Sequence, residues 1–310
     1  MASRTNVSLV RKFLSVRGIP TCLLKAGEVH ESDTKAGKSL FLIIPGNPGV
    51  IDFYDEFQKI LHSASESAIP VWGVAHAGHM EVPKDMTPKA GQSGDLYELE
   101  DQINHKIAFI EDHIPANTRL VLIGHSIGCY IILEILRRKP NLPIQKGILL
   151  FPTIERMAQT PNGVVSKPLA LNFRWAAYLA ASLAYYLPDC IKLFLIRLHL
   201  RGSTMNPTAA LSACHLFNPD CLNNLIFMGG QEMQQVNEPD TSTIKENLSK
   251  LIFYYGQTDK WCPVEFYEEM KNRFPDGRIV MDDRGMSHAF CLRASREMAE
   301  LIWEWTRKDL

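Results

Sequence analysis

Short apolar runs along this chain alternate with segments in which apolar residues recur at helical spacing. Residues 39–44 (SLFLII) form a nearly uninterrupted apolar run, which is typical of a strand buried on both faces of a sheet. Further runs predict strands at 70–74, 119–123, 147–151, 250–255 and 278–282, and helices at 53–67, 95–113, 126–138, 263–273 and 290–306. This alternation predicts a mainly parallel sheet that is covered by helices on both faces.

One long segment, residues 152–249, interrupts the alternation because it carries no strand pattern. It begins directly after one predicted strand and ends directly before another, so we expect a largely helical insertion that caps the core. The chain therefore divides into a core formed by residues 1–151 and 250–310 and a cap formed by residues 152–249. Two short strands that are predicted within residues 8–25 belong to the core.

The composition excludes several classes of protein. The 33 Lys and Arg residues balance 34 Asp and Glu residues, so the chain offers no surface for a polyanion and nucleic acid is not an expected partner. The seven cysteines form no CxxC pair, which argues against a disulfide framework and against a structural metal site. The first 18 residues lack the apolar core of a signal peptide, so we expect a location that faces the cytosol.

A serine between a predicted strand and a predicted helix is the strongest local signal. Gly124, Ser126 and Gly128 form a GxSxG pattern in the context of a nucleophile elbow, a sharp turn that exposes the serine oxygen. The oxygen would then lie at the N-terminus of the helix, where peptide dipoles favour developing negative charge. The alternative is a tight turn with an inert serine.

A nucleophilic serine needs a base and an acid that orients the base. In sheets of this kind the chain order is serine, acid, histidine. His288 follows the last predicted strand and is the predicted base, and Asp259 in the loop after the preceding strand is the predicted acid. Glu155 is the alternative acid. Asp282 and its neighbour Asp283 end the strand that precedes His288, so we expect them to point away from a shared site.

Two backbone N–H groups are needed to bind the oxyanion of the tetrahedral intermediate. One belongs to Ile127, directly after the nucleophile, and the other is expected in the loop 45–49 (PGNPG). Proline has no N–H, so Asn47 and Gly46 are the candidates within this loop, and Asn47 is the better placed of the two. The alternative is that this loop is only a rigid turn. His125 either packs in the core or lines the pocket.

Residues 169–200 form the most apolar part of the chain, with no charge in the thirteen residues from Trp175 to Leu187. As a helix these thirteen residues would span about 20 Å, which is short of the roughly 30 Å hydrocarbon core of a bilayer. Because Pro188 breaks the segment before a second, basic apolar stretch, we expect a hairpin that dips into one monolayer. The residues expected in contact with lipid are Trp175, Tyr178, Leu183, Tyr185, Tyr186 and Leu187. The alternative is a cap that packs over the pocket.

Three segments carry a resemblance to a known family: LIIPGNPGVIDFYDEF, IGHSIGCYIILEIL and YYGQTDKWCP. With them the chain resembles an α/β-hydrolase, and within that superfamily the lipid droplet-associated hydrolase family. The resemblance implies a triad of Ser126, Asp259 and His288, and hydrolysis of lipid esters with sterol esters as the suggested class. It also implies a location on lipid droplets and the endoplasmic reticulum. The predicted triad mechanism needs no metal or organic cofactor. PGNPG replaces the HGG or HGF of many lipases.

The predicted function is therefore that of a serine hydrolase of lipid esters. One alternative is a catalytically weak module that recruits other proteins to a lipid surface, and another is acyl transfer, in which an alcohol replaces water. His215 and Asp220 match an HxxxxD acyltransferase pattern, which we interpret as a chance match because it lies in the cap, away from any strand end.

Overall fold

The structure is a computed structural model that describes residues 7–29, 38–86, 97–199 and 207–310. Several sequence predictions reach beyond these ranges, since residues 1–6 and 30–37 of the predicted core and residues 200–206 of the predicted cap are not described. Residues 95 and 96 of the predicted helix 95–113, residues 87–94 of its preceding loop and the last residue of the apolar segment 169–200 lie outside the described residues.

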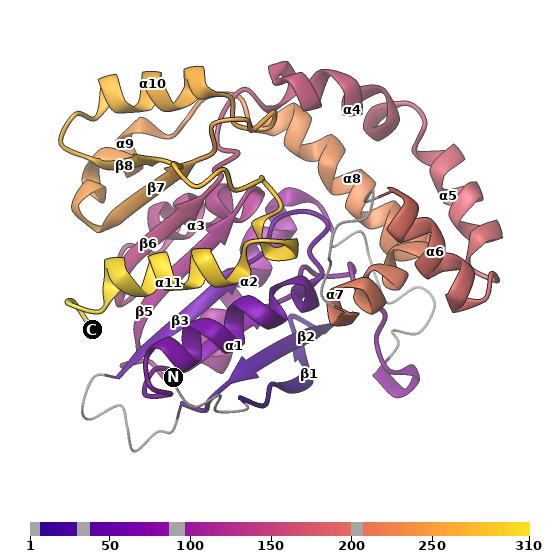
Figure 1. Cartoon of the computed structure of the whole chain (residues 1–310), viewed down its shortest axis with the longest axis horizontal. Coiled ribbons are helices and arrows are strands. Elements are labelled where there is room, and N and C mark those ends of the chain that lie inside the picture. The colour runs from indigo at the N-terminus through magenta and orange to yellow at the C-terminus, as the bar shows by residue number, and fades with distance from the viewer. Residues whose placement is uncertain (1–6, 30–37, 87–96, 200–206) are drawn as a thin grey trace.

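Within the described residues, eight strands form one sheet, whose order is β1-β2-β4-β3-β5-β6-β7-β8 (Figure 1). The strands from β4 to β8 in this order run parallel, whereas β2 pairs antiparallel with both β1 and β4. A mainly parallel sheet is thus confirmed. The strands are β1 (Val10–Val16), β2 (Ile19–Ala26), β3 (Ser39–Ile44), β4 (Val71–Val74), β5 (Arg119–His125), β6 (Ile144–Leu150), β7 (Leu251–Tyr255) and β8 (Arg278–Met281).

Helices cover both faces of this sheet, which explains why β3 is apolar throughout. Leu40 and Leu42 belong to the core on one face, and Phe41 and Ile43 belong to the core on the other. Each such side chain contributes about 1.5–3 kcal/mol when it is buried. The first face is covered by α2 (Leu99–His113), α3 (Ile127–Arg138) and α10 (Val264–Arg273), and the second by α1 (Asp55–Ala64) and α11 (Ser295–Thr306).

Two predicted helices are divided in the structure because their first turns are 3₁₀ turns, and the predicted helix 95–113 begins only at Leu99, after the non-helical residues 97 and 98. The predicted helix 53–67 divides into η2 (Ile51–Tyr54) and α1, and the predicted helix 290–306 divides into η7 (Phe290–Leu292) and α11. The helix α1 ends early because the Ser65 hydroxyl accepts a hydrogen bond from the N–H of Ile69 and the following residue, Glu66, takes a positive φ.

The described residues of the segment 152–249, for which we use the name cap, contain helices and no strand. They form α4 (Pro161–Leu171), α5 (Arg174–Ala184), α6 (Asp189–His199), α7 (Pro207–Ser212), α8 (Pro219–Gln235) and α9 (Thr241–Glu246), with 3₁₀ turns η4 (Met157–Gln159), η5 (Ala213–Phe217) and η6 (Leu248–Lys250). Figure 1 shows α4, α5, α6 and α8 together on one side of the molecule. The predicted apolar hairpin corresponds to α5 and α6, which are separated by a break at Pro188.

None of the helices in the described ranges combines the length and the apolar character that crossing a bilayer requires.

Candidate active site

Ser126 occupies a sharp turn between β5 and α3, with φ of 54° and ψ of −123°. A side chain at either neighbouring glycine would collide with backbone. A Cβ on Gly128 would lie 2.2 Å from the carbonyl oxygen of Ile44, and a Cβ on Gly124 would lie 2.8 Å from the backbone of Gly128. These close approaches explain why the turn needs glycine on both sides of the strained serine.

The structure brings the three predicted catalytic side chains into one hydrogen-bonded chain. The Ser126 hydroxyl lies 3.0 Å from Nε2 of His288, and Nδ1 of His288 lies 2.6 Å from Oδ2 of Asp259. The Asp259 side chain is 1% exposed and that of His288 is 19% exposed, so the acid is shielded while the base reaches the cavity. This geometry allows Nδ1–H to donate to the carboxylate while Nε2 accepts the serine proton.

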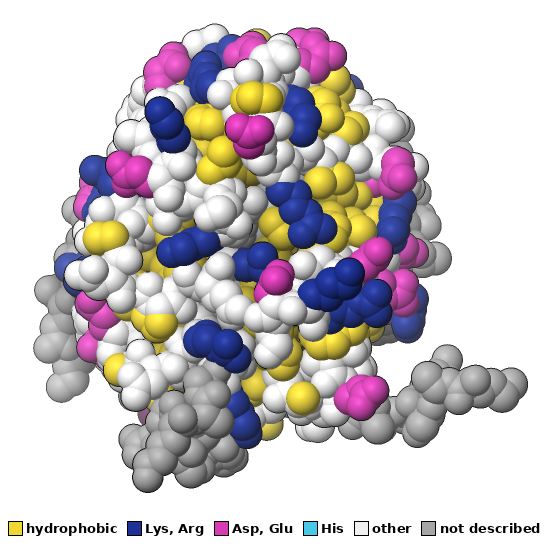
Figure 2. All heavy atoms as spheres, turned by 90° about the vertical axis from the view of Figure 1, so that its left-hand side faces the viewer, with side chains coloured by type: hydrophobic (Ala, Val, Ile, Leu, Met, Phe, Trp, Pro, Cys, Tyr) yellow, Lys and Arg dark blue, Asp and Glu magenta, His cyan; other side chains and the backbone are white. Residues whose placement is uncertain are grey.

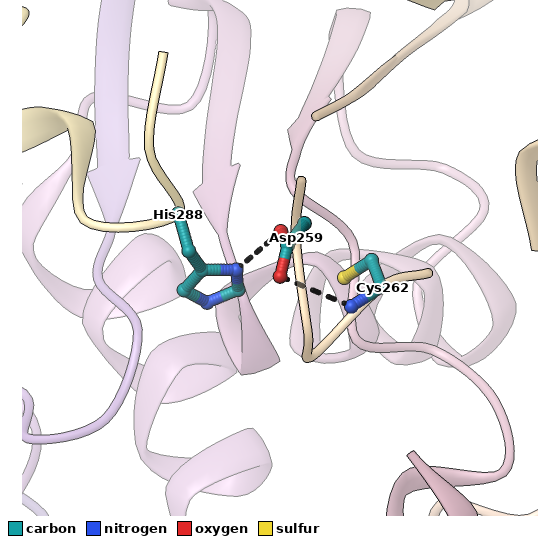
Figure 3. Close-up of side chains that lie close together, drawn as sticks. All are labelled: Asp259, Cys262 and His288. Atoms are coloured by element: carbon teal, nitrogen blue, oxygen red, sulfur yellow. Dashed lines mark hydrogen bonds and ion pairs between the residues drawn. The ribbon is translucent and has the colours of Figure 1, made fainter. Parts of the chain in front are cut away.

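Asp259 is held in the orientation that serves His288. Its Oδ1 accepts hydrogen bonds from the N–H groups of Trp261 at 2.7 Å and Cys262 at 3.2 Å, which leaves Oδ2 directed at the imidazole (Figure 3). A carboxylate with backbone donors on one oxygen has little freedom to rotate, and the acid is thereby preorganised.

Asp259, Cys262 and His288 form a group of three residues that could each offer a ligand atom to a metal ion. The sulfur of Cys262 lies within 4.8 Å of the ligand atoms of the other two. A cysteine binds metals as a thiolate, but burial raises the pKa of Cys262 well above its ordinary value. In addition, Nδ1 of His288 already donates its hydrogen to Asp259. The chemistry of this group therefore fits the orientation of an imidazole and does not fit a metal site.

The alternative acids lie elsewhere. Glu155 bonds to the guanidinium of Arg156 at 2.6 Å. Asp282 is fully buried and accepts hydrogen bonds from the Tyr254 hydroxyl at 2.5 Å and from the backbone N–H groups of Arg284 and Met286. Asp282 thus holds the loop that leads to His288, whereas neither residue contacts the imidazole.

Of the two candidate N–H donors in the loop 45–49, that of Asn47 is the one available to bind an oxyanion. The N–H of Gly46 donates to the Tyr54 hydroxyl at 3.1 Å, whereas no hydrogen bond from the N–H of Asn47 is found within the described ranges. The N–H of Ile127, as the first of α3, has no carbonyl partner inside its own helix. Both Asn47 and Ser126 line the same cavity.

The side chain of His125, which lies in the nucleophile elbow, forms hydrogen bonds with Tyr54 and with the backbone of the base His288. Its Nε2 donates to the carbonyl of His288 at 2.8 Å, and its Nδ1 accepts from the Tyr54 hydroxyl at 2.6 Å. Burial lowers the pKa of His125 to about 3, so the imidazole is neutral and can act as donor and acceptor at once. Of the two predicted roles of His125, packing and pocket lining, the structure supports packing. The ring is buried, and His125 is not among the described residues that line the cavity at Ser126.

A cavity of about 370 Å³, hereafter the catalytic cavity, contains Ser126 and His288. Sequence reasoning missed three of the polar or aromatic groups near the nucleophile: Thr153, Trp261 and Glu232. The Thr153 hydroxyl lies 3.4 Å from the Ser126 hydroxyl, and Trp261 and Glu232 line the cavity. Trp261 lies in the segment YYGQTDKWCP, two positions after Asp259, which is the signal that marks it in the sequence. Thr153 and Glu232 belong to no motif, so only the packing of distant segments reveals them.

Glu232 is a carboxyl group inside the catalytic cavity on the cap helix α8. It is 2% exposed, and burial raises its pKa to about 8. The side-chain amide of Asn47 donates to Oε1 of Glu232 at 3.1 Å and to the carbonyl of Leu225 at 2.8 Å. The cap is therefore hydrogen-bonded to the residue whose N–H is the candidate oxyanion donor.

Apart from Val10, the large hydrophobic side chains that are exposed in the described residues all lie between Val164 and Leu211. We call this surface of α4 to α7 the apolar face. Its members are Val164, Val165, Leu169, Phe173, Trp175, Tyr178, Leu179, Leu183, Tyr185, Tyr186, Ile191, Phe194, Leu195, Leu198 and Leu211. The opposite side of the molecule shows interspersed charges of both signs (Figure 2). Among the predicted lipid-contacting residues only Leu187 is half-buried.

The HxxxxD match does not form an acyltransferase site. His215 lies 3.6 Å from Glu81, and Asp220 belongs to the first turn of α8, which is capped by the side chain of Asn218.

The fold is similar to those of solved α/β-hydrolases. An esterase from Exiguobacterium antarcticum superposes with a TM-score of 0.61 at 15% sequence identity, covering 96% of this chain and 100% of that chain. An epoxide hydrolase from Vigna radiata superposes with a TM-score of 0.61 at 14% identity, covering 97% and 98%. The predicted α/β-hydrolase fold is confirmed.

The sequence itself matches at the level of a family. The family profile described as lipid-droplet associated hydrolase matches residues 37–291. Identity to the lipid droplet-associated hydrolase of Gallus gallus is 43% over 99% of this chain and 98% of that protein. Identity to the protein of that name from Homo sapiens is 41% over 99% and 98%, and to that from Drosophila melanogaster 34% over 94% and 95%. The chain therefore belongs to the lipid droplet-associated hydrolase family.

Proposed function

We propose that this protein is a serine hydrolase that cleaves carboxylic esters of lipids through Ser126, His288 and Asp259. The single observation that carries the proposal is the continuous hydrogen-bonded chain from the Ser126 hydroxyl through the imidazole to the Asp259 carboxylate. In such a chain the imidazole takes the serine proton during attack, and the carboxylate stabilises the imidazolium that forms.

The proposed reaction has two halves. Oγ of Ser126 bonds to the ester carbonyl carbon while its proton moves to Nε2 of His288, and the N–H groups of Ile127 and Asn47 stabilise the oxyanion. The C–O bond to the alcohol then breaks, and the imidazolium returns the proton to the departing oxygen. A water molecule, which gives a proton to Nε2 of His288, then attacks the carbonyl carbon of the acyl-enzyme. The bond between the acyl group and Oγ of Ser126 breaks, His288 returns the proton to Oγ, and the carboxylic acid leaves. These steps use three side chains, two backbone N–H groups and water.

The lipid character of the substrate is inferred from the surroundings of the triad. The catalytic cavity has mostly apolar walls from the cap, and Leu169 both lines this cavity and belongs to the apolar face. Burying apolar surface in lipid contributes roughly 25 cal/mol per Å², so exposed side chains such as Trp175, Leu183 and Tyr186 favour a position at a lipid surface. We place the protein on lipid droplets, with sterol esters as the substrate class that the family resemblance implies. The endoplasmic reticulum stays a prediction.

The first test is labelling of the purified protein by a fluorophosphonate, with Ser126→Ala and His288→Ala measured alongside. Labelling of the wild type that both substitutions abolish supports the proposal, and release of fatty acid from an emulsified sterol ester then tests the substrate class. If the wild type is not labelled even with vesicles present, the proposed chemistry is wrong.

The exposed apolar face also supports a second function, in which the protein binds a lipid surface and recruits others without turnover. That function predicts that Ser126→Ala retains the cellular effect of the wild type on lipid storage. Acyl transfer predicts instead that, during turnover of an ester, an added alcohol attacks the acyl-enzyme in place of water, so that a new ester forms and Ser126 regains its proton.

A further inference from the structure

A second cavity adjoins the catalytic cavity. It has a volume of about 630 Å³, and Pro48, Leu216 and Leu222 line both cavities. Among the residues that the structure describes, its wall consists only of apolar side chains, which include Phe53, Ala181, Leu195, Ala213, Leu222 and Leu292. We call this cavity the apolar chamber.

We propose that the apolar chamber binds a long hydrocarbon group of the ester while the ester carbonyl lies at Ser126. This inference rests on the proposed function and names the part of the protein that selects the substrate. In a wall whose described side chains are all apolar, these side chains offer no partner for a polar group, so a hydrocarbon is the ligand that it accepts without loss of hydrogen bonds. Pro48, which lines both cavities, directly follows Asn47, so the chamber begins beside the candidate oxyanion donor.

The chamber also connects to the outside at the apolar face. The helices α5 and α6 contribute Ala177, Ala180 and Leu195 to the chamber wall and carry the apolar face on their outer surface. Leu195 belongs to both, because it lines the chamber and is 38% exposed. A hydrocarbon that leaves a lipid surface at this point reaches Ser126 along apolar side chains, which avoids the free-energy cost of passing through water.

Filling the chamber tests the proposal. Ala181 on α5 is 5% exposed and lines the chamber, so Ala181→Phe places a ring in the empty volume. Ala176→Phe is the matched control, since Ala176 lies on the same helix and lines neither cavity. Ala213→Leu, in η5, fills the chamber from a different element if Ala181→Phe does not fold.

Three substrates test whether the chamber binds the acyl chain of the ester or its alcohol. They are 4-nitrophenyl butyrate, with two small groups, 4-nitrophenyl palmitate, with a long acyl chain, and cholesteryl butyrate, with a large alcohol. We expect a filled chamber to leave kcat/KM for 4-nitrophenyl butyrate within about twofold and to lower kcat/KM for one of the larger esters by about tenfold or more. A selective loss for palmitate assigns the chamber to the acyl chain, and a selective loss for the sterol ester assigns it to the alcohol. Equal loss for all three substrates, or no loss, overturns the proposal.

A binding measurement separates this inference from the proposed chemistry. In the Ser126→Ala background, fluorescence of dehydroergosterol and of a pyrene-labelled fatty acid reports occupancy without turnover. We expect Ala181→Phe to lower the affinity for one of these probes by about tenfold and Ala176→Phe to leave it unchanged. If Ala181→Phe and Ala176→Phe both leave the affinity for the probes unchanged, the chamber is not the hydrocarbon site. If the probes bind normally but the wild type does not turn over any ester, only the proposed hydrolysis is contradicted.

Discussion

The imidazole of His125 donates from Nε2 to the backbone carbonyl of His288 at 2.8 Å. The residue beside the nucleophile thus holds the main chain of the candidate base, and the Tyr54 hydroxyl in turn holds His125 and the N–H of Gly46. The elbow, the loop of the base and the loop 45–49 therefore meet in one buried network. Because catalysis depends on small distances between reacting atoms, a shift in any one of these loops affects all three.

This network predicts the effect of its removal. We expect His125→Ala to lower kcat by about 100-fold with little change in KM, because a displaced base affects the chemical step and not ground-state binding. His125→Gln retains a donor for the His288 carbonyl and should recover part of the loss. Tyr54→Phe should cost about fivefold, in line with about 1 kcal/mol for one hydrogen bond. Steady-state kinetics on a soluble ester would separate kcat from KM, and an equal rise in KM would argue against a positioning role.

The strained serine gives a prediction for stability as well as activity. Ser126→Ala and Ser126→Gly should both lower turnover by about 10⁶, as in other triads. Because Ser126 has a positive φ, the variant with glycine should be more stable than the variant with alanine by about 1 kcal/mol. Urea unfolding of the two variants measures this difference, and a less stable glycine variant would show that the strain is absent.

Asp259 and Glu155 give opposite predictions. Asp259→Asn should lower kcat by about 10⁴, because an amide donor favours the wrong tautomer of the base. Glu155→Gln should change kcat by less than about fivefold, since its carboxylate pairs with Arg156 and does not contact the imidazole. The reverse ranking in rates of ester cleavage would transfer the role of the acid to Glu155.

Glu232 predicts a dependence of stability on pH. Burial raises its pKa from 4.5 to about 8, so between these values the folded protein holds a proton that the unfolded chain has lost. The contribution of Glu232 to the free energy of unfolding therefore falls as pH rises, by about 1.4 kcal/mol per pH unit. We expect Glu232→Gln to remove this contribution, so that its stability relative to the wild type increases from pH 5 to pH 8. Glu238→Gln, at an exposed position, is the control. Parallel pH profiles for the wild type and Glu232→Gln in urea unfolding would contradict the raised pKa.

The apolar face predicts how the protein partitions to lipid. Leu183 and Tyr186 are 73% and 85% exposed, so replacing both with Asp removes apolar contact without disturbing the core. We expect at least about tenfold weaker flotation with phospholipid-coated triolein droplets, and an unchanged Tm. Val10→Asp, at the exposed hydrophobic position outside this face, should float like the wild type. Unchanged flotation of the double variant would favour a cap that only covers the pocket.

The sequence by itself determined the features that depend on neighbouring residues. The apolar run of β3 predicts a strand buried on both faces, the glycines around Ser126 predict a sharp turn, and the chain order places Asp259 and His288 after later strands. The ends of the helices were not determined by the sequence. The hydroxyl of Ser65 and the 3₁₀ turns limit the α-helices at positions where the apolar spacing continues.

Only the tertiary structure decided the features that depend on distant residues. Asn47 and Glu232 are 185 positions apart, and no local pattern marks a glutamate that will be buried beside that loop. The same holds for His125, whose role depends on a carbonyl 163 positions away, and for the apolar chamber, which unites alanines of α5 with Pro48 and Leu292. Burial and hydrogen-bond partners are properties of packing, and packing brings together segments whose separation in the sequence carries no signal of their contact.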